Sequence, residues 1–417
     1  MSTSTSTATS TFLTRPFRAL SSLSSFPRAL PWANMTRPVG TNTTRPNRPV
    51  GTKPTRLART LALHTGMALL LPSAFCLLPS FSPLRANPPV ADYIDASIER
   101  GLRFLAEGQI LTGHAREVGN FESGPSRNIP GIAALAGMAF LAKGYLPGEG
   151  EYGETLNRCI DAVLAAADAN GYMGGNGGRM YSHAMCTLFL SEVSHMMKDT
   201  DRQERLEKVL PNATKIIVDA QQKPQKDGNN KGGWRYEPTS GDSDLSCSGW
   251  NLMALRSARL KGAPVPVKCI EDAVGYLLRR HNEQSGTFGY QDNSSYATTL
   301  SGAAILGLAL CGQHNNPAIA RGVRFLMTVY DRLPNETRCF YGMYYTAQGI
   351  FQYGGEEWQK FSTWMYDYWI PRQTHEGKWD RGEEGCPYYQ TAMVVLSFTV
   401  PYRQLPIYTR DETVDQE

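Results

Sequence analysis

Acidic side chains are missing from the first 91 residues, which contain ten Lys or Arg and no Asp or Glu. The whole chain has 42 basic and 38 acidic residues, so the part after residue 91 holds 32 basic against 38 acidic ones. This mildly acidic balance argues against a general nucleic-acid-binding surface, and no nucleic-acid partner is expected.

Cysteine is scarce, and no CxxC pair occurs. Seven cysteines follow residue 86, and an odd number at wide spacings argues against both a disulfide framework and a Cys-rich zinc knuckle. The sequence also contains no phosphate-binding glycine loop, no GxSxG nucleophile motif and no HExxH helix. We predict that most of the cysteines are buried as small apolar residues: Cys159, Cys186, Cys247, Cys269, Cys311, Cys339 and Cys386.

Residues 1–60 are rich in Ser, Thr, Pro and Arg, which predicts a disordered segment or a gene start placed too far upstream. Residues 61–86 fit a signal peptide, with Arg56 and Arg59 before them, an apolar run at 67–78 and the small residue Ala86. The apolar run is too short and Pro-broken for a comfortable transmembrane span. We therefore expect an exported protein, periplasmic or extracellular, whose mature chain begins near Asn87; a signal anchor is the alternative.

From residue 92 the sequence alternates amphipathic helices, as in 94–109, with helices that are apolar on nearly every face, as in 131–144. The apolar helices begin near 130, 181, 245, 296, 341 and 388, a spacing of roughly 45 to 65 residues that is typical of helical-hairpin repeats. Amphipathic helices belong outside and all-apolar ones inside. We predict an all-α fold, an α6/α6 toroid of six helical hairpins that forms one domain over 87–417. An open solenoid fits less well, because we find no polar capping repeat.

A loop near the end of the chain carries a family resemblance. Gln373 is followed by Gly377 and Trp379, which resembles the QW motif of squalene and terpenoid cyclases. Residues 92–403 resemble the prenyltransferase and squalene-cyclase repeat superfamily, whose fold is the α6/α6 toroid. We expect the Gly to end the outer helix in a left-handed turn, and the Gln and the aromatic side chain to brace neighbouring repeats. Weaker copies of the motif are Gln284 with Gly286 and Phe288, and Gln222 with Gly232 and Trp234.

The loop before the third apolar helix contains Asp242 and Asp244. It is similar at three of four positions to the Asp-x-Asp-Asp motif of class II terpenoid cyclases, with Leu245 in place of the last Asp. The resemblance implies that Asp244 is the proton donor and Asp242 its partner. A carboxyl beside a second carboxylate in an apolar cavity retains its proton through like-charge repulsion and desolvation. The alternative is that Asp244 caps the helix by accepting a backbone N–H near Ser246 or Cys247.

Protein prenyltransferase β subunits of the same superfamily bind zinc through an Asp-x-Cys motif and a later His. In this chain Asp244 and Cys247 are one residue too far apart, and His183 is the one His at the head of an apolar helix. These residues make a poor zinc site, so we predict no metal site, and the sequence identifies no cofactor. In the alternative reading, Cys247 is a core residue and His183 a hydrogen-bonded one.

Aromatic and amide side chains gather at the heads of the predicted inner helices. They could hold an apolar chain or stabilise a carbocation, or they could brace loops. Asn251 lies seven residues after Asp244, on the same helix face. The predicted substrate-binding residues are Trp234, Tyr236, Cys247, Asn251, His183, Tyr181, Tyr341, Tyr345, Gln348 and Tyr388.

Two functions follow from these patterns. The first is a class II terpenoid cyclase-like enzyme that acts on an isoprenoid-like or other apolar small molecule in a central apolar pocket. The second is a non-catalytic secreted binding or scaffold module, favoured by the missing last aspartate of the motif and by the lack of the second barrel that squalene cyclases carry. A carbohydrate-active α/α barrel ranks last, because it requires two opposed carboxylates, whereas Asp242 and Asp244 adjoin one another.

Overall fold

The computed structural model describes residues 92–123, 129–293, 298–381 and 384–408. Within them the chain forms twelve α-helices. The predicted disordered start, residues 1–60, and the predicted signal peptide, residues 61–86, lie outside the described residues. Across the described ranges, no helix combines the length and the apolar character that a membrane span requires.

The helices alternate along the chain between an outer and an inner set. The inner helices begin within two residues of the positions predicted from the apolar segments. The outer helices are α1 (Asp92–Glu107), α3 (Gly153–Ala166), α5 (Thr200–Gln221), α7 (Val267–Arg279), α9 (Pro317–Leu326) and α11 (Gly355–Trp369). The inner helices are α2 (Pro130–Lys143), α4 (Arg179–Val193), α6 (Leu245–Leu260), α8 (Thr298–Leu310), α10 (Cys339–Tyr353) and α12 (Pro387–Phe398).

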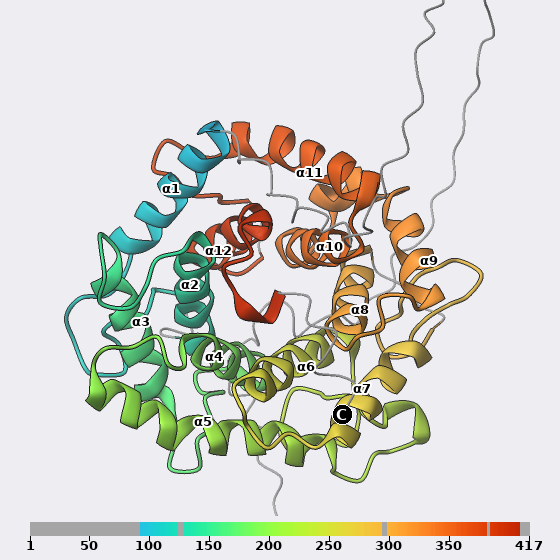
Figure 1. Ribbon diagram of the computed structural model, residues 1–417, viewed down its shortest axis with the longest axis horizontal. Helices are drawn as coiled ribbons and strands as arrows, with labels where there is room; N and C mark the ends of the chain where they lie inside the picture. The colour runs from blue at the N-terminus through green and yellow to red at the C-terminus, as the bar shows by residue number, and fades with distance from the viewer. Residues whose placement is uncertain (1–91, 124–128, 294–297, 382–383, 409–417) are drawn as a thin grey trace, which may run out of the picture.

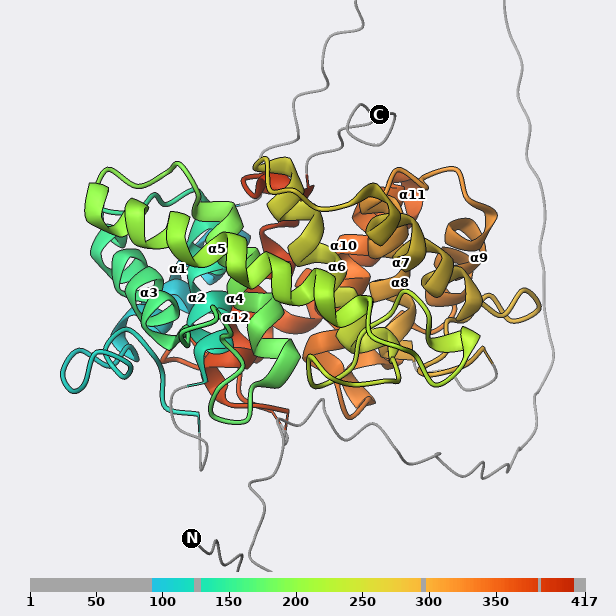
Figure 2. The ribbon, with the colours of Figure 1, turned by 90° about the horizontal axis from the view of Figure 1, so that it is seen from below.

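The six inner helices form a closed ring, visible in Figure 1. Each contacts the next in chain order, and α12 returns to contact α2. The outer helices surround this ring, and α1 packs against α12, so the first and last helices meet. In the side view the helices form a single disc (Figure 2). The structure confirms the predicted all-α toroid of six helix pairs.

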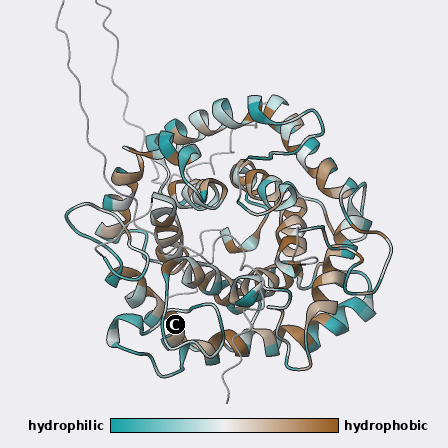
Figure 3. Cartoon of the chain, turned by 180° about the vertical axis from the view of Figure 1, so that it is seen from behind, coloured by the Kyte–Doolittle hydropathy of each residue, from teal (hydrophilic) through white to brown (hydrophobic). Residues whose placement is uncertain are grey.

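Burial follows the composition of the two sets. Every residue of α8 is buried, whereas α7 buries only the stripe that faces the inner ring. Figure 3 shows the same division, with the inner helices mostly hydrophobic and the outer surface mostly hydrophilic. A Cβ on Gly302 of α8 would lie 2.6 Å from the backbone nitrogen of Thr346 in α10, so glycine permits this close helix contact. All seven predicted core cysteines are buried.

The QW-like motif joins the last outer helix to the first. Gln373 Oε1 accepts a hydrogen bond from Ser97 Oγ at 2.8 Å, and Gln373 Nε2 donates to the Ser97 carbonyl at 2.9 Å. Trp379 Nε1 donates to the carbonyl of Trp369, at the end of α11, at 2.8 Å. The predicted bracing of neighbouring repeats is thus confirmed at this position.

The role predicted for the glycine of this motif is wrong. Gly377 has φ 94°, but it lies beyond both α11 and the 3₁₀ helix η4 (Ile370–Arg372), so it does not end the outer helix. A Cβ at Gly377 would stand 2.3 Å from the carbonyl oxygen of Arg100 in α1. Glycine therefore allows the loop to lie directly on the next outer helix.

The two weaker copies also need correction. Gln221, rather than Gln222, is the bracing residue: its Nε2 donates to the carbonyls of Gly232 at 2.9 Å and Cys269 at 2.8 Å. Gln284 is exposed, although Gly286 and Phe288 of the same copy are buried.

After α12 the chain passes through η5 (Val400–Tyr402) and returns to the ring with η6 (Pro406–Tyr408), which contacts α6. The Ile407 N–H donates to Glu192 Oε2 of α4 at 3.3 Å, and Gln352 Nε2 of α10 donates to the Tyr408 carbonyl at 3.0 Å. The Tyr408 and Tyr344 hydroxyls are hydrogen-bonded to each other. The chain therefore places its own residues between α4, α6 and α10, on the side where α4 ends.

Candidate functional site

Asp244 lies at the N-terminus of α6 and is fully buried. Its Oδ1 accepts hydrogen bonds from the Cys247 N–H and from Ser246 Oγ, both at 2.8 Å. Its backbone N–H donates to the Trp234 carbonyl at 3.0 Å, which closes the preceding loop. The predicted capping role is confirmed, because a helix N-terminus has unpaired N–H groups and a favourable dipole for a carboxylate.

Arg235 stands between the two aspartates. Its Nε lies 3.4 Å from Asp244 Oδ2, and its Nη1 lies 3.6 Å from Asp242 Oδ2. The guanidinium also lies over the rings of Tyr236, at 4.5 Å from the centroid, and Tyr290, at 5.7 Å. A half-buried cation therefore separates Asp244 from Asp242.

Burial raises the pKa of Asp244 to about 6, although the Cys247 N–H, Arg235 and Ser246 act to lower it. The desolvation that we predicted for this carboxyl is therefore present. The predicted repulsion from Asp242 is wrong, because Asp242 is partly exposed and faces Arg235 and Lys226 instead. Desolvation alone keeps the proton on Asp244 at mildly acidic pH.

Tyrosines surround Asp244. Tyr181 of α4 forms a 2.6 Å hydrogen bond with Ser246 Oγ, so a chain of hydrogen bonds runs from Tyr181 through Ser246 to Asp244. The Tyr236 and Tyr290 hydroxyls are 2.7 Å apart. Burial, and next the charge of Asp244, raise the pKa values of Tyr181, Tyr236 and Tyr341. These phenols are accordingly neutral hydrogen-bonding groups near neutral pH.

Tyr341, Tyr345 and Gln348 of α10 lie at helical spacing and are all buried. The rings of Tyr341 and Tyr345 are 4.7 Å apart, and the Tyr345 ring lies 5.3 Å from that of Trp250 in α6. Among the described residues, no partner hydrogen-bonds to the hydroxyls of Tyr341 and Tyr345 or to Gln348 Oε1. Buried polar atoms without partners are unfavourable by about 1 to 3 kcal/mol each, so this cluster lowers the stability of the ring interior.

Asn251 and Cys247 lie beside this cluster on α6. Asn251 Nδ2 donates to the Cys247 carbonyl at 2.9 Å, and within the described chain its Oδ1 has no hydrogen-bond partner. Cys247 Sγ donates to the Arg235 carbonyl at 2.9 Å, and burial raises the pKa of its thiol well above the usual value. Cys247 is therefore a neutral packing residue next to Asp244, as the alternative reading predicted.

Three predicted site residues lie apart from this group. The Trp234 indole is buried and its Nε1 donates to the Ile217 carbonyl of α5 at 2.8 Å. His183 accepts from the Met173 N–H at 3.2 Å and contacts the Ala213 carbonyl of α5 at 3.0 Å, and burial lowers its pKa to about 4. Both side chains face the outer helix rather than the ring interior. The Tyr388 ring stacks on Phe104 of α1 at 5.1 Å, so it also packs outward.

Glu384, which the sequence analysis missed, is a buried carboxylate like Asp244 and Glu192. It is 2% exposed, and its two oxygens accept from the Phe340 and Tyr341 N–H groups at the start of α10, both at 2.9 Å. The Tyr389 hydroxyl lies 3.4 Å away. Burial raises the pKa of Glu384 to about 7. In the sequence, its position in a Gly- and Glu-rich loop just before an apolar helix could have identified it as a candidate.

Metal-binding residue types do not gather in the described ranges: no group of three or more His, Cys, Asp or Glu side chains is close enough to hold an ion. Asp244 and Cys247 are neighbours, but His183 points toward α5. These residues do not form the ligand set that zinc requires.

No protein-family model and no curated protein matches this chain. Solved structures do match it in fold. An inactive variant of the α-1,6-mannanase GH76A of Salegentibacter sp. HEL1_6, in complex with α-1,6-mannotriose, gives a TM-score of 0.52 at 10% identity, covering 75% of this chain and 99% of the mannanase. The type II terpene cyclase MstE from Scytonema gives 0.48 at 14% identity, covering 76% and 100%. The fold is an α/α toroid. At these identities the similarity shows the architecture alone.

Proposed function

We propose that the protein binds an apolar, isoprenoid-like small molecule where the inner helices begin, and that Asp244 donates a proton to it. The setting of Asp244 carries the proposal. Its carboxyl is fully buried, its pKa is raised to about 6, and the rings of Tyr181 and Tyr341 belong to the same cluster. A carboxylic acid of this kind is partly protonated near neutral pH and acts as a general acid.

The neighbours of Asp244 fit the charges that proton transfer to an alkene or an epoxide creates. Arg235 and the Ser246 hydroxyl stabilise the carboxylate left behind. The tyrosine rings offer π-faces to positive charge on carbon. Leu245 replaces the last aspartate of the cyclase motif, so in this proposal Arg235 and Ser246 supply the interactions that increase the acidity of Asp244.

Purified protein incubated with squalene, oxidosqualene and geranylgeraniol, with products analysed by mass spectrometry, tests the proposal. We expect cyclised or isomerised product, a rate that falls as pH rises through about 6, and a loss of at least a hundredfold in Asp244→Asn. The matched control is Asp199→Asn, which alters another helix-capping aspartate, on α5, whose Oδ1 accepts from the Arg202 N–H at 2.9 Å. Turnover by Asp244→Asn at the wild-type rate would exclude the proposal.

A second function, the non-catalytic binding or scaffold module, is favoured by the packing within the ring. Tyr408 of η6 reaches Tyr344, and the hollow between Gln348 and Tyr408 measures only about 10 Å³, room for about one water molecule. This alternative predicts no product with any of the three isoprenoids. Asp244→Asn would then change stability only, through the α6 cap.

A further inference from the structure

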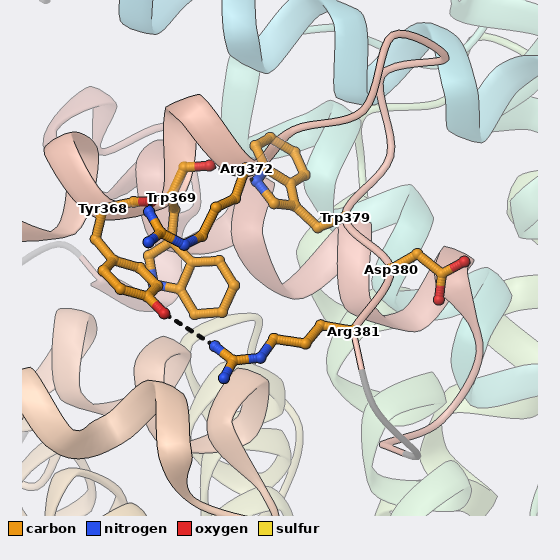
Figure 4. A pocket seen from close by; sticks show the side chains of 6 residues that line it. All are labelled: Tyr368, Trp369, Arg372, Trp379, Asp380 and Arg381. Carbon is orange, nitrogen blue, oxygen red and sulfur yellow. Dashed lines mark hydrogen bonds between the residues drawn. The ribbon is translucent and has the colours of Figure 1, made fainter.

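A separate hollow of about 360 Å³ lies between the end of α11 with η4 and the chain at 379–381. Figure 4 shows its six lining residues: Tyr368, Trp369, Arg372, Trp379, Asp380 and Arg381. The volume lies within the range of pockets that hold small molecules. None of these residues belongs to the Asp244 site, so the two sites are independent.

Two arginines dominate the charge of this hollow. The Arg372 guanidinium lies over the Tyr368 ring, 3.7 Å from its centroid, and Arg381 Nη1 donates to the Tyr368 hydroxyl at 2.9 Å. Neither arginine forms an ion pair with an acidic residue of the described chain; the acidic residue here, Asp380, pairs with Lys378 at 3.3 Å. In Figure 4 both guanidinium groups lie on the side of Tyr368 and Trp369, whereas the Asp380 carboxylate points away. Both cations retain N–H donors for an anion.

The two tryptophans form the buried wall of the hollow. Trp379 Nε1 donates to the Trp369 carbonyl, but within the described residues the Trp369 Nε1–H has no acceptor. Trp369 is only 1% exposed, so its N–H is a buried donor that lies beneath the surface of the hollow. Two guanidinium groups and the partly exposed Tyr368, above the two buried tryptophans, together form a site rich in hydrogen-bond donors.

We propose that this hollow binds a small organic anion, in which one carboxylate or phosphate group is attached to an aromatic body. The anionic oxygens accept from Arg372 and Arg381, because planar guanidinium groups match the two oxygens of a carboxylate or phosphate. The aromatic body lies beside Tyr368 and the planar guanidinium groups, which stack on aromatic rings. A bare inorganic anion makes only the first set of contacts, and a neutral aromatic makes only the second.

The test uses 2-naphthoate and 2-naphthyl phosphate as probes and saturation-transfer NMR and calorimetry as readouts, on the full chain. We expect both to bind at submillimolar concentration, and inorganic phosphate and 2-naphthamide to bind at least tenfold more weakly. Arg381→Ala and Arg372→Ala should each weaken naphthoate binding at least tenfold, and Arg381→Lys, which keeps the charge but loses the planar fork, by a smaller factor. If one naphthyl anion binds and the other does not, that result identifies the anionic group within the proposed class.

Arg332→Ala is the matched control, because it removes one exposed arginine from η3 (Tyr330–Asn335), outside the hollow. It should leave naphthoate affinity unchanged, and all variants should retain the wild-type melting temperature to within a few degrees. Absent binding of both anions to the wild type overturns the proposal. So does equal binding of naphthamide, or an equal loss of affinity in Arg332→Ala.

Discussion

The loops that lead into α6 and α12 share a set of contacts. A glycine with positive φ, Gly232 or Gly377, lies against a carbonyl of the next outer helix. The following tryptophan, Trp234 or Trp379, donates from its indole to a carbonyl of α5 or α11. The backbone N–H of each tryptophan donates to a hydroxyl of the inner helix, Ser248 Oγ at 2.9 Å or Thr391 Oγ1 at 3.2 Å. The repeat therefore fixes the backbone of both loops in the same way.

The two loops differ in the carboxylate that follows. Asp244 caps its own helix, α6, and faces Arg235, whereas Glu384 accepts from the first N–H groups of the neighbouring helix α10. Burial raises both pKa values, to about 6 for Asp244, with Arg235 opposing it, and to about 7 for Glu384. The comparison shows that the repeat determines where a carboxylate can be buried, while non-equivalent neighbours determine its chemistry.

The shared backbone geometry gives the largest expected effect. A Cβ at Gly232 would lie 2.0 Å from the Asp272 carbonyl oxygen, and one at Gly377 2.3 Å from that of Arg100. We expect Gly232→Ala and Gly377→Ala each to lower the free energy of unfolding by about 3 to 5 kcal/mol, measured by urea denaturation. Gly262 has nearly the same φ, 86°, with nothing within 4 Å, so Gly262→Ala should lose only about 1 kcal/mol. Equal losses in all three variants would show that backbone strain, and not contact between repeats, accounts for these glycines.

Removing each carboxylate tests the difference between the loops. Asp244→Ala removes the α6 cap and leaves Arg235 without its buried partner, so we expect a loss of about 3 kcal/mol in unfolding free energy. Glu384→Ala leaves two N–H groups of α10 without acceptors, and we expect about 2 kcal/mol. Thermal and urea unfolding of both variants measure the difference. The double variant Asp244→Ala/Arg235→Met removes the cation that Asp244→Ala leaves unpaired, so it should recover part of the lost stability. A further loss of stability would show that Arg235 does not need Asp244 as its partner.

The positions of helices were predictable from the sequence, whereas the directions of individual side chains were less so. Apolar segments such as those of α2 and α8 predict where an inner helix begins. Such a helix is buried on every face, so its position can be predicted without knowing which way each side chain points. Successive helical residues point about 100° apart. A choice between Tyr388 and Tyr389 is therefore a choice between the α1 surface and the Glu384 carboxylate.

Loop residues were the other limit of prediction. Asp244 was identified because it directly precedes an apolar helix, where capping has a sequence signature. Glu384 and Arg235 occupy loops without periodicity, and contacts with other repeats set their orientation. His183 was predicted to face the ring interior, but the acceptor for its ring lies on α5, at Ala213.

The pH dependence of unfolding distinguishes the two carboxylates further. Each has a folded-state pKa above its ordinary value of 3.8 or 4.5. At pH values between the ordinary and the folded-state pKa, the folded state therefore binds more protons than the unfolded state. The contribution of each group to stability is therefore fully present below about pH 4, and it is lost as pH rises through about 6 for Asp244 and about 7 for Glu384. We expect Asp244→Asn and Glu384→Gln each to remove about 3 kcal/mol of this decline. Urea midpoints from pH 4 to 8 of the wild type and both variants measure it. Glu192, whose pKa burial also raises to about 7, is present in all three proteins, so the comparison uses the part of the decline that each variant loses; loss of the same pH range in both variants would contradict the assignment.

The bracing glutamines give the smallest expected effect and test ring closure. Gln221 Nε2 joins neighbouring parts of the chain, from Gly232 to Cys269, whereas Gln373 joins the loop after α11 to Ser97 in α1. Gln221→Ala loses three side-chain hydrogen bonds and Gln373→Ala four. Water replaces part of them, so we expect about 1 to 2 kcal/mol for each variant. Only Gln373→Ala should speed amide hydrogen exchange throughout α1. Gln373 joins the last loop to this helix, which otherwise meets the end of the chain only through its packing on α12 and the contacts near it. Equal exchange of α1 in Gln221→Ala and Gln373→Ala would mean that the packing of α1 on α12 closes the ring without the glutamine.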